Sequence, residues 1–189
     1  MARKTMTVEE FKRLAAKPRK KRKTRAQWVA QFAATPPAPT LTSQEKAAQR
    51  SLFEKHDAAE YHFRIGLAPT ANKHWVPFVL PRPGRRFRAA LHLSEEAVAF
   101  REHVASVWRS YWNGYPPEAL TGKIRLCLLV HPRSAAETDS DNRIKPTQDA
   151  LAHAGVYAND CQVKSLRVDE GAVVRPHGAI DVIVEVIPE

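Results

Sequence analysis

Alternating hydrophobic and polar positions predict five β-strands in this chain. The clearest case is 61–67, where apolar side chains at every second position share one face of an extended backbone. Similar apolar segments recur further along the chain. The predicted strands cover residues 61–67, 87–93, 123–130, 163–168 and 179–187.

Apolar residues with helical spacing predict two helices between these strands. Ser94 is placed to cap a helix whose buried stripe spans 97–111. A shorter helix is expected over 144–154, with Gly155 as its C-cap and an irregular first turn, because Pro146 fits poorly inside a helix. The order of elements predicts an α+β (mixed α/β) fold, in which helices pack on one mixed sheet.

The N-terminal part of the chain has helix signals of its own. Capping residues predict short helices over 7–17 and 42–55. A third helix is predicted over 24–34, where Trp28, Val29 and Phe32 lie on one side. The stretch 35–40 contains three prolines, which favour a stiff, extended linker. We therefore divide the chain into a basic helical arm with its linker, residues 1–40, and one domain, residues 41–189.

Charge separates the same two parts. Lys and Arg number 30 against 20 acidic residues, which gives a net charge of +10. Residues 1–40 hold eleven basic and two acidic residues, so +9 belongs to the arm and +1 to the remainder. This excess of positive charge makes nucleic acid the first partner to consider.

Other classes of protein are disfavoured. We find no apolar run long enough for a membrane span. The N-terminus is basic, but it is not followed by the apolar segment that a secretory signal peptide contains. The two cysteines form neither a disulfide framework nor a zinc motif. We expect a cytoplasmic protein without membrane association.

Candidate chemistry gathers in one segment. Asp139 and Asp141 lie two residues apart, so both side chains leave the same face of an extended chain, and Mg²⁺ is the cation that such a pair suits. Asp160 follows the next helix and can join them if that helix runs back along the sheet. The alternative is that Asp141 caps the helix. Lys145 can clamp a phosphate, pair with Asp149 four residues on, or do both.

This segment resembles the RusA family of Holliday-junction resolvases, small endodeoxyribonucleases common in phages and prophages. The likeness covers about residues 60–187, including 67–73 and 93–95 upstream of the motif. Its specific part consists of Asp139, Asp141-Asn142, Lys145, Asp149-Ala150-Leu151, Ala154-Gly155 and Asp160-Cys161-Gln162. Two departures are Asn159, where family members often carry a further aspartate, and the lack of a basic residue at 137–138.

The resemblance implies a Mg²⁺-dependent homodimer that nicks four-way DNA junctions in recombination and repair. It implies metal-binding catalytic roles for Asp139, Asp141 and Asp160, and a catalytic role for Lys145. Two other functions stay open: a non-catalytic DNA-binding phage accessory protein, and a nuclease that prefers forks or flaps.

Two groups of basic residues are candidates for contact with DNA phosphates. One belongs to the arm and the other to a segment rich in proline and arginine. The candidates are Lys20, Lys21, Arg22, Lys23, Lys73, Arg82, Arg85, Arg86 and Arg88. The alternatives for the arm are a solubility tail or, in a eukaryotic host, a nuclear localisation signal. The alternative for the second group is an edge strand protected from aggregation by its charge. We expect His131, Trp75, Trp108 and Trp112 to be packing residues.

Overall fold

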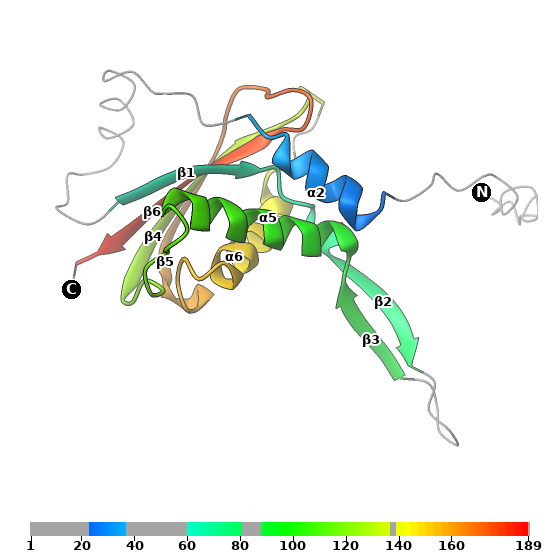
Figure 1. Ribbon diagram of the computed structural model, residues 1–189, viewed down its shortest axis with the longest axis horizontal. Coiled ribbons are helices and arrows are strands. Elements are labelled where there is room, and N and C mark those ends of the chain that lie inside the picture. Colours follow the sequence, from blue (N-terminus) through cyan, green and yellow to red (C-terminus); the bar gives the residue numbers. More distant parts are fainter. Residues whose placement is uncertain (1–22, 37–59, 81–87, 137–138, 189) are drawn as a thin grey trace, which may run out of the picture.

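A computed structural model describes residues 23–36, 60–80, 88–136 and 139–188 of the chain. The predicted α+β class is confirmed: helices cover one face of a four-stranded mixed sheet, and a two-stranded ribbon projects from this body (Figure 1). No helix in the described ranges is long and apolar enough to cross a membrane.

The main sheet has the strand order β1-β6-β4-β5. Strands β1 (Glu60–Gly66), β6 (Ala179–Ile187) and β4 (Lys123–His131) are successive antiparallel neighbours, whereas β5 (Val163–Glu170) runs parallel to β4. Parallel neighbours need a crossover, and α6 (Ile144–His153) lies in the connection between them. The four predicted strands of this sheet are confirmed.

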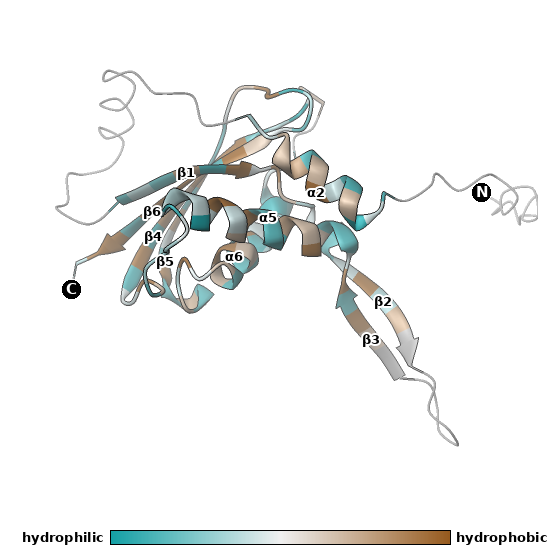
Figure 2. Ribbon diagram, in the orientation of Figure 1, coloured by the Kyte–Doolittle hydropathy of each residue, from teal (hydrophilic) through white to brown (hydrophobic). Residues whose placement is uncertain are grey.

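The core lies between the sheet and helix α5 (Glu95–Tyr111). The side chain of Ser94 accepts a hydrogen bond from the amide of Ala97, which caps the helix as predicted. Phe100 and Trp108 are almost fully buried on the helix face toward the sheet. Figure 2 shows hydrophobic segments of the central strands lying beneath α5.

Helix α2 (Arg25–Ala33) is packed onto this body. The helix predicted over 24–34 is confirmed, and a capping box between Thr24 and Gln27 begins it. The Phe32 ring is 2% exposed and lies 5.4 Å from the ring of Phe100 and 5.6 Å from that of His103. The second helix of the predicted arm therefore forms part of the core. The division at residue 40 and the helices expected over 7–17 and 42–55 fall outside the described residues.

The predicted strand at 87–93 exists as β3 (Arg88–Leu93), but its expected place in the main sheet was wrong. It pairs with β2 (Trp75–Leu80), a strand that the sequence analysis missed, in a separate ribbon that follows the short helix α4 (Ala71–His74). Pro77 argued against a strand at this position, but proline is tolerated in a strand that pairs on one side only, as β2 does.

Of the residues expected to pack, Trp108 is 1% exposed, whereas Trp75 is 47% exposed on the ribbon. The packing role expected for Trp75 holds only in part, because its ring contacts the ring of His74 edge-on at 5.3 Å and the rest is exposed. Trp112 packs against the edge of the core, as predicted.

Candidate active site

The candidate site begins where the chain enters α6. A 3₁₀ turn, η1 (Asp141–Arg143), precedes the helix, so the irregular first turn predicted from Pro146 is confirmed. Arg143 is 6% exposed and donates to the carbonyl of Ala68, and its own carbonyl accepts a hydrogen bond of 2.8 Å from the hydroxyl of Thr147. These bonds fix the turn against the segment after β1.

The two aspartates of this turn have different surroundings. Asp139 Oδ1 accepts a hydrogen bond of 2.7 Å from the side-chain amide of Asn142. Asp141 is exposed, and no side-chain hydrogen bond caps either η1 or α6. The alternative that Asp141 caps the helix was therefore wrong.

A second 3₁₀ turn, η2 (Asp160–Gln162), presents the third aspartate. Asn159 caps it, since its side chain accepts from the amide of Cys161. The side chain of Gln162 donates to the carbonyls of Leu120 and Gly122 and accepts from the amide of Asn159. Asn159 and Gln162 thus close the turn and attach it to the chain before β4, which fixes the backbone of Asp160.

Lys145 and Asp160, both predicted site residues, meet in the structure. Lys145 Nζ lies 2.5 Å from Asp160 Oδ2 and 2.9 Å from Asp149 Oδ1, so the alternative pairing with Asp149 is also confirmed. The hydrogen bonds to Asp160 and Asp149 raise the pKa of Lys145, and the bond from Lys145 lowers the pKa of Asp160. Lys145 and Asp160 are therefore both ionised at neutral pH.

The structure does not gather the three predicted metal ligands. Among the described residues, no group of three Asp, Glu, His or Cys side chains is arranged to hold a metal ion. A site shared by Asp139, Asp141 and Asp160 therefore stays a prediction. What the structure brings together is Lys145 with two carboxylates, and Asp139 with Asn142.

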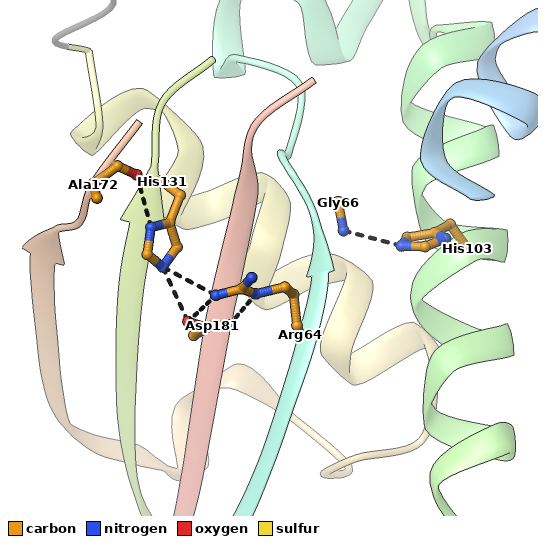
Figure 3. Close-up of polar contacts among 6 residues, drawn as sticks. All are labelled: Arg64, Gly66, His103, His131, Ala172 and Asp181. Atoms are coloured by element: carbon orange, nitrogen blue, oxygen red, sulfur yellow. Dashed lines mark hydrogen bonds and ion pairs between the residues drawn. The ribbon is translucent and has the colours of Figure 1, made fainter. Parts of the chain in front are cut away.

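A buried polar cluster lies at the end of β4, from which the chain leads to the candidate site (Figure 3). Arg64 Nε and Nη2 lie 2.6 and 2.7 Å from the two carboxylate oxygens of Asp181. His131 Nε2 lies 3.0 Å from Asp181, and its Nδ1 lies 2.9 Å from the carbonyl of Ala172. His131, the last residue of β4, therefore forms hydrogen bonds in addition to the packing role that was expected for it.

The charges in this cluster support one another. The hydrogen bond to Asp181 raises the pKa of His131. Burial alone would raise the pKa of Asp181, but the hydrogen bonds from Arg64 and His131 outweigh burial and lower that pKa to about 2. The cluster joins β1, β6 and β4 through contacts between these side chains.

The predicted DNA contacts are described only in part. Lys73 is exposed on α4, and Arg88 begins β3. Lys23 Nζ lies 2.6 Å from the side-chain oxygen of Gln31 and 4.7 Å above the centre of the Trp28 ring. The other predicted contacts lie outside the described residues: Lys20, Lys21, Arg22, Arg82, Arg85 and Arg86.

Sequence reasoning missed the supporting residues of the site. His74 is 2% exposed, and its Nε2 lies 4.0 Å from Asp149 Oδ2. Nothing in the local pattern marks His74, because its neighbour Asp149 is 75 residues away in the chain. Gln162 belonged to the quoted motif, but its attachment to the Leu120 carbonyl could not be read from spacing.

Comparison with known proteins covers the part of the site that contains Asp139, Asp141, Lys145, Asp149 and Asp160. A family model described as endodeoxyribonuclease RusA matches residues 75–185. The crossover junction endodeoxyribonuclease of Enterobacteria phage 82 is 27% identical over 108 residues, which are 57% of this chain and 80% of that protein. RusA of Escherichia coli K12 is 31% identical over 84 residues, 44% of this chain and 68% of the relative. The protein of Enterobacteria phage HK97 is 24% identical over 123 residues, or 65% and 92% of the two chains.

Proposed function

Because the chain belongs to the RusA family of endodeoxyribonucleases, we propose that it hydrolyses phosphodiester bonds at four-way DNA junctions, in recombination and repair. We further propose that it acts as a homodimer and uses Mg²⁺. The observation that carries the proposal is the 2.5 Å contact between Lys145 and Asp160. It places a cation and a carboxylate from distant turns together at the surface, inside the matched region.

The chemistry of the donor set fits a hard divalent cation. Asp139, Asp141 and Asp160 are exposed and offer carboxylate oxygens, which Mg²⁺ prefers. We propose that these three residues hold the ion, with Asp160 leaving Lys145 to do so. When bound, the ion would make a water molecule nucleophilic near neutral pH and neutralise charge on the phosphate.

Lys145 would stabilise the extra negative charge that the phosphate acquires during hydrolysis. Its ammonium has three N–H donors, two of which face Asp149 and Asp160. The side chain is 59% exposed, so a DNA phosphate can reach the remaining donor. A fixed positive charge at this position favours the transition state over the ground state, because the transition state carries more negative charge.

Contacts with the DNA backbone would come from outside the catalytic turn. Lys73 is exposed on α4, immediately before the projecting ribbon, whose connecting segment carries Arg82, Arg85 and Arg86. Contacts of this kind neutralise phosphates without reading base sequence. They agree with selection of DNA by its branched shape.

A cleavage assay tests the proposal. Junction, fork, flap and duplex DNA are incubated with the chain in Mg²⁺ and in EDTA, and we expect paired nicks in the junction with Mg²⁺ alone. Asp141→Asn should lower the cleavage rate at least about 100-fold, since removing even an outer partner of a metal site costs about 10–100-fold. Binding of the junction should be unchanged or tighter, because a negative charge near phosphate is lost.

The control is Asp169→Asn, which makes the same chemical change in an exposed pair with Arg167 on β5. We expect this variant to cleave like the wild type. Binding of DNA with no cleavage of any substrate would contradict the proposal and favour the accessory protein. Faster cleavage of forks or flaps than of junctions would favour the other nuclease.

The role of the arm needs a separate test that spares α2, because Phe32 lies in the core. Replacing Lys20, Lys21 and Arg22 by Gln should weaken junction binding and flatten its dependence on salt. Each lost phosphate contact is expected to reduce the slope of log K against log salt by about 0.9. An unchanged slope would make the arm a solubility tail.

A further inference from the structure

Asp149 contacts the candidate site from beneath Lys145. It lies one helical turn after Lys145 on α6, and its Oδ1 lies 2.9 Å from the Lys145 ammonium. The Asp149 side chain is 20% exposed, against 44% for Asp160 and 59% for Lys145. The ammonium therefore has one carboxylate on its inner side and one at the surface.

His74 lies behind Asp149. Its Nε2 is 4.0 Å from Asp149 Oδ2, and its ring is 2% exposed. Within the described part of the chain, neither ring nitrogen has a hydrogen-bond partner. Burial, and then the charge of Arg101, lower the pKa of His74, which favours the neutral imidazole, and in this form one ring nitrogen can donate a hydrogen bond.

The two carboxylates cannot serve Lys145 in the same way during the proposed reaction. A divalent cation and an ammonium repel each other, so the Asp160 oxygen now 2.5 Å from Lys145 is a poor metal ligand until Asp160 turns away from the ammonium. Asp149 is outside the predicted ligand set. It can therefore keep its bond to Lys145 whatever Asp160 does.

We propose that Asp149 is a positioning residue: it holds the Lys145 ammonium at the site when Asp160 turns to a divalent cation, and the buried imidazole of His74 packs behind its other carboxylate oxygen. This inference rests on the proposed function, because it assigns a task within the same site. It extends the site inward by two residues, one of which, His74, precedes the matched region 75–185.

A double-mutant cycle tests the coupling. Asp149→Asn keeps the shape of the side chain and removes its charge, and we expect kcat on the four-way junction to fall by about 10–100-fold. KM should stay nearly constant, because binding of the DNA backbone is untouched. The variant that combines Asp149→Asn with Lys145→Ala should be no slower than Lys145→Ala alone.

Additive losses in this cycle would overturn the proposal, because a merely structural Asp149 would act independently of Lys145. An Asp149→Asn variant with the kcat of the wild type would also overturn the proposal. Asp169→Asn is the matched control and should leave kcat unchanged. His74→Phe should lower kcat in the wild type and leave it unchanged when Asp149 is already Asn.

A second measurement needs no activity. Nitrogen-15 NMR of lysine ammonium groups reports slow proton exchange when an ammonium is held by a carboxylate, and Lys145→Ala identifies the signal of Lys145. We expect this signal to persist in the wild-type chain after Mg²⁺ is added and to disappear in Asp149→Asn with Mg²⁺. Loss of the signal in the wild type on adding Mg²⁺ would overturn the proposal. Absence of junction cleavage by the wild type, with the signal retained, would instead contradict the proposed function.

Discussion

Asp181 and Asp160 are both held by basic side chains, but in opposite surroundings. Asp181 and its partner Arg64 have side chains that are 8% and 7% exposed, whereas Asp160 and Lys145 are 44% and 59% exposed. Separating the buried pair would strand a charge away from water, which is costly. Separating the exposed pair costs little, because water replaces each partner. The first arrangement holds three strands together, and the second can exchange partners, as a catalytic site requires.

The largest expected effect comes from breaking the buried pair. Asp181→Asn leaves the charge of Arg64 without its carboxylate and should lower the free energy of unfolding by about 3–5 kcal/mol. Chemical denaturation measures this change. The matched variant is Asp160→Asn, which should abolish junction cleavage and leave the denaturation midpoint nearly unchanged.

Two results would contradict this contrast between the buried pair and the exposed pair. A wild-type denaturation midpoint for Asp181→Asn would show that the buried pair does not stabilise the sheet. A large loss of stability in Asp160→Asn would make the exposed pair structural. Adding Arg64→Met to Asp181→Asn should destabilise the chain by less than the sum of the two changes, because the stranded charge is removed.

The next effect is a dependence of stability on pH that comes from buried histidines. His103 Nε2 accepts the amide of Gly66 at 3.0 Å, and burial lowers the pKa of His103 to about 4 (Figure 3). The unfolded chain therefore takes up a proton first as pH falls. Stability from His103 is complete above about pH 6.5 and should fall by about 3 kcal/mol as pH drops to about 4.

His131 should act in the opposite direction. The hydrogen bond to Asp181 raises the pKa of His131, so its contribution is complete below about 6.5 and is lost as pH rises through the folded-state value. Urea denaturation across pH tests both. His103→Gln should flatten the acid side of the profile, and His131→Gln the alkaline side. An unchanged acid side in His103→Gln would contradict the assignment.

Local patterns predicted much of the fold, because the physics that fixes these elements is local. Ser94 caps α5 through an amide three residues away, and the alternation in 61–67 puts Phe63 and Ile65 in the core. The same holds for the irregular start of α6 at Pro146. The errors arose where pairing decides the outcome: β3 pairs with β2 rather than with the main sheet, and nothing within 87–93 specifies that choice.

The residues of the candidate site could be predicted from the sequence, but their arrangement in space could not. Lys145 and Asp160 were identified from residue type and motif, and they meet across 15 residues. The buried contacts depend on longer separations: Arg64 and Asp181 are 117 residues apart. His74 has no periodic or motif signal, so only the folded chain shows that it lies behind Asp149.

A pair of intermediate burial should give an intermediate effect. Arg125 Nη1 lies 2.9 Å from Glu185 Oε2 on neighbouring strands β4 and β6, with side chains 23% and 11% exposed. Glu185→Gln should lower the free energy of unfolding by about 1.5–3 kcal/mol, the range for hydrogen bonds to charged groups. Denaturation in low and high salt measures it. An effect as large as that of Asp181→Asn would show that burial does not set the order.

The smallest effect is expected at the surface contact between α2 and α5. Arg25 and Glu102 form an ion pair, but their side chains are 56% and 43% exposed. Glu102→Gln should therefore change the free energy of unfolding by less than about 1 kcal/mol, and high salt should abolish the difference. Phe32→Ala is the contrasting variant, with an expected loss of about 3–5 kcal/mol, because the Phe32 ring is buried against Phe100. If Glu102→Gln instead released α2 as completely as Phe32→Ala does, charge rather than burial would hold this helix on the body.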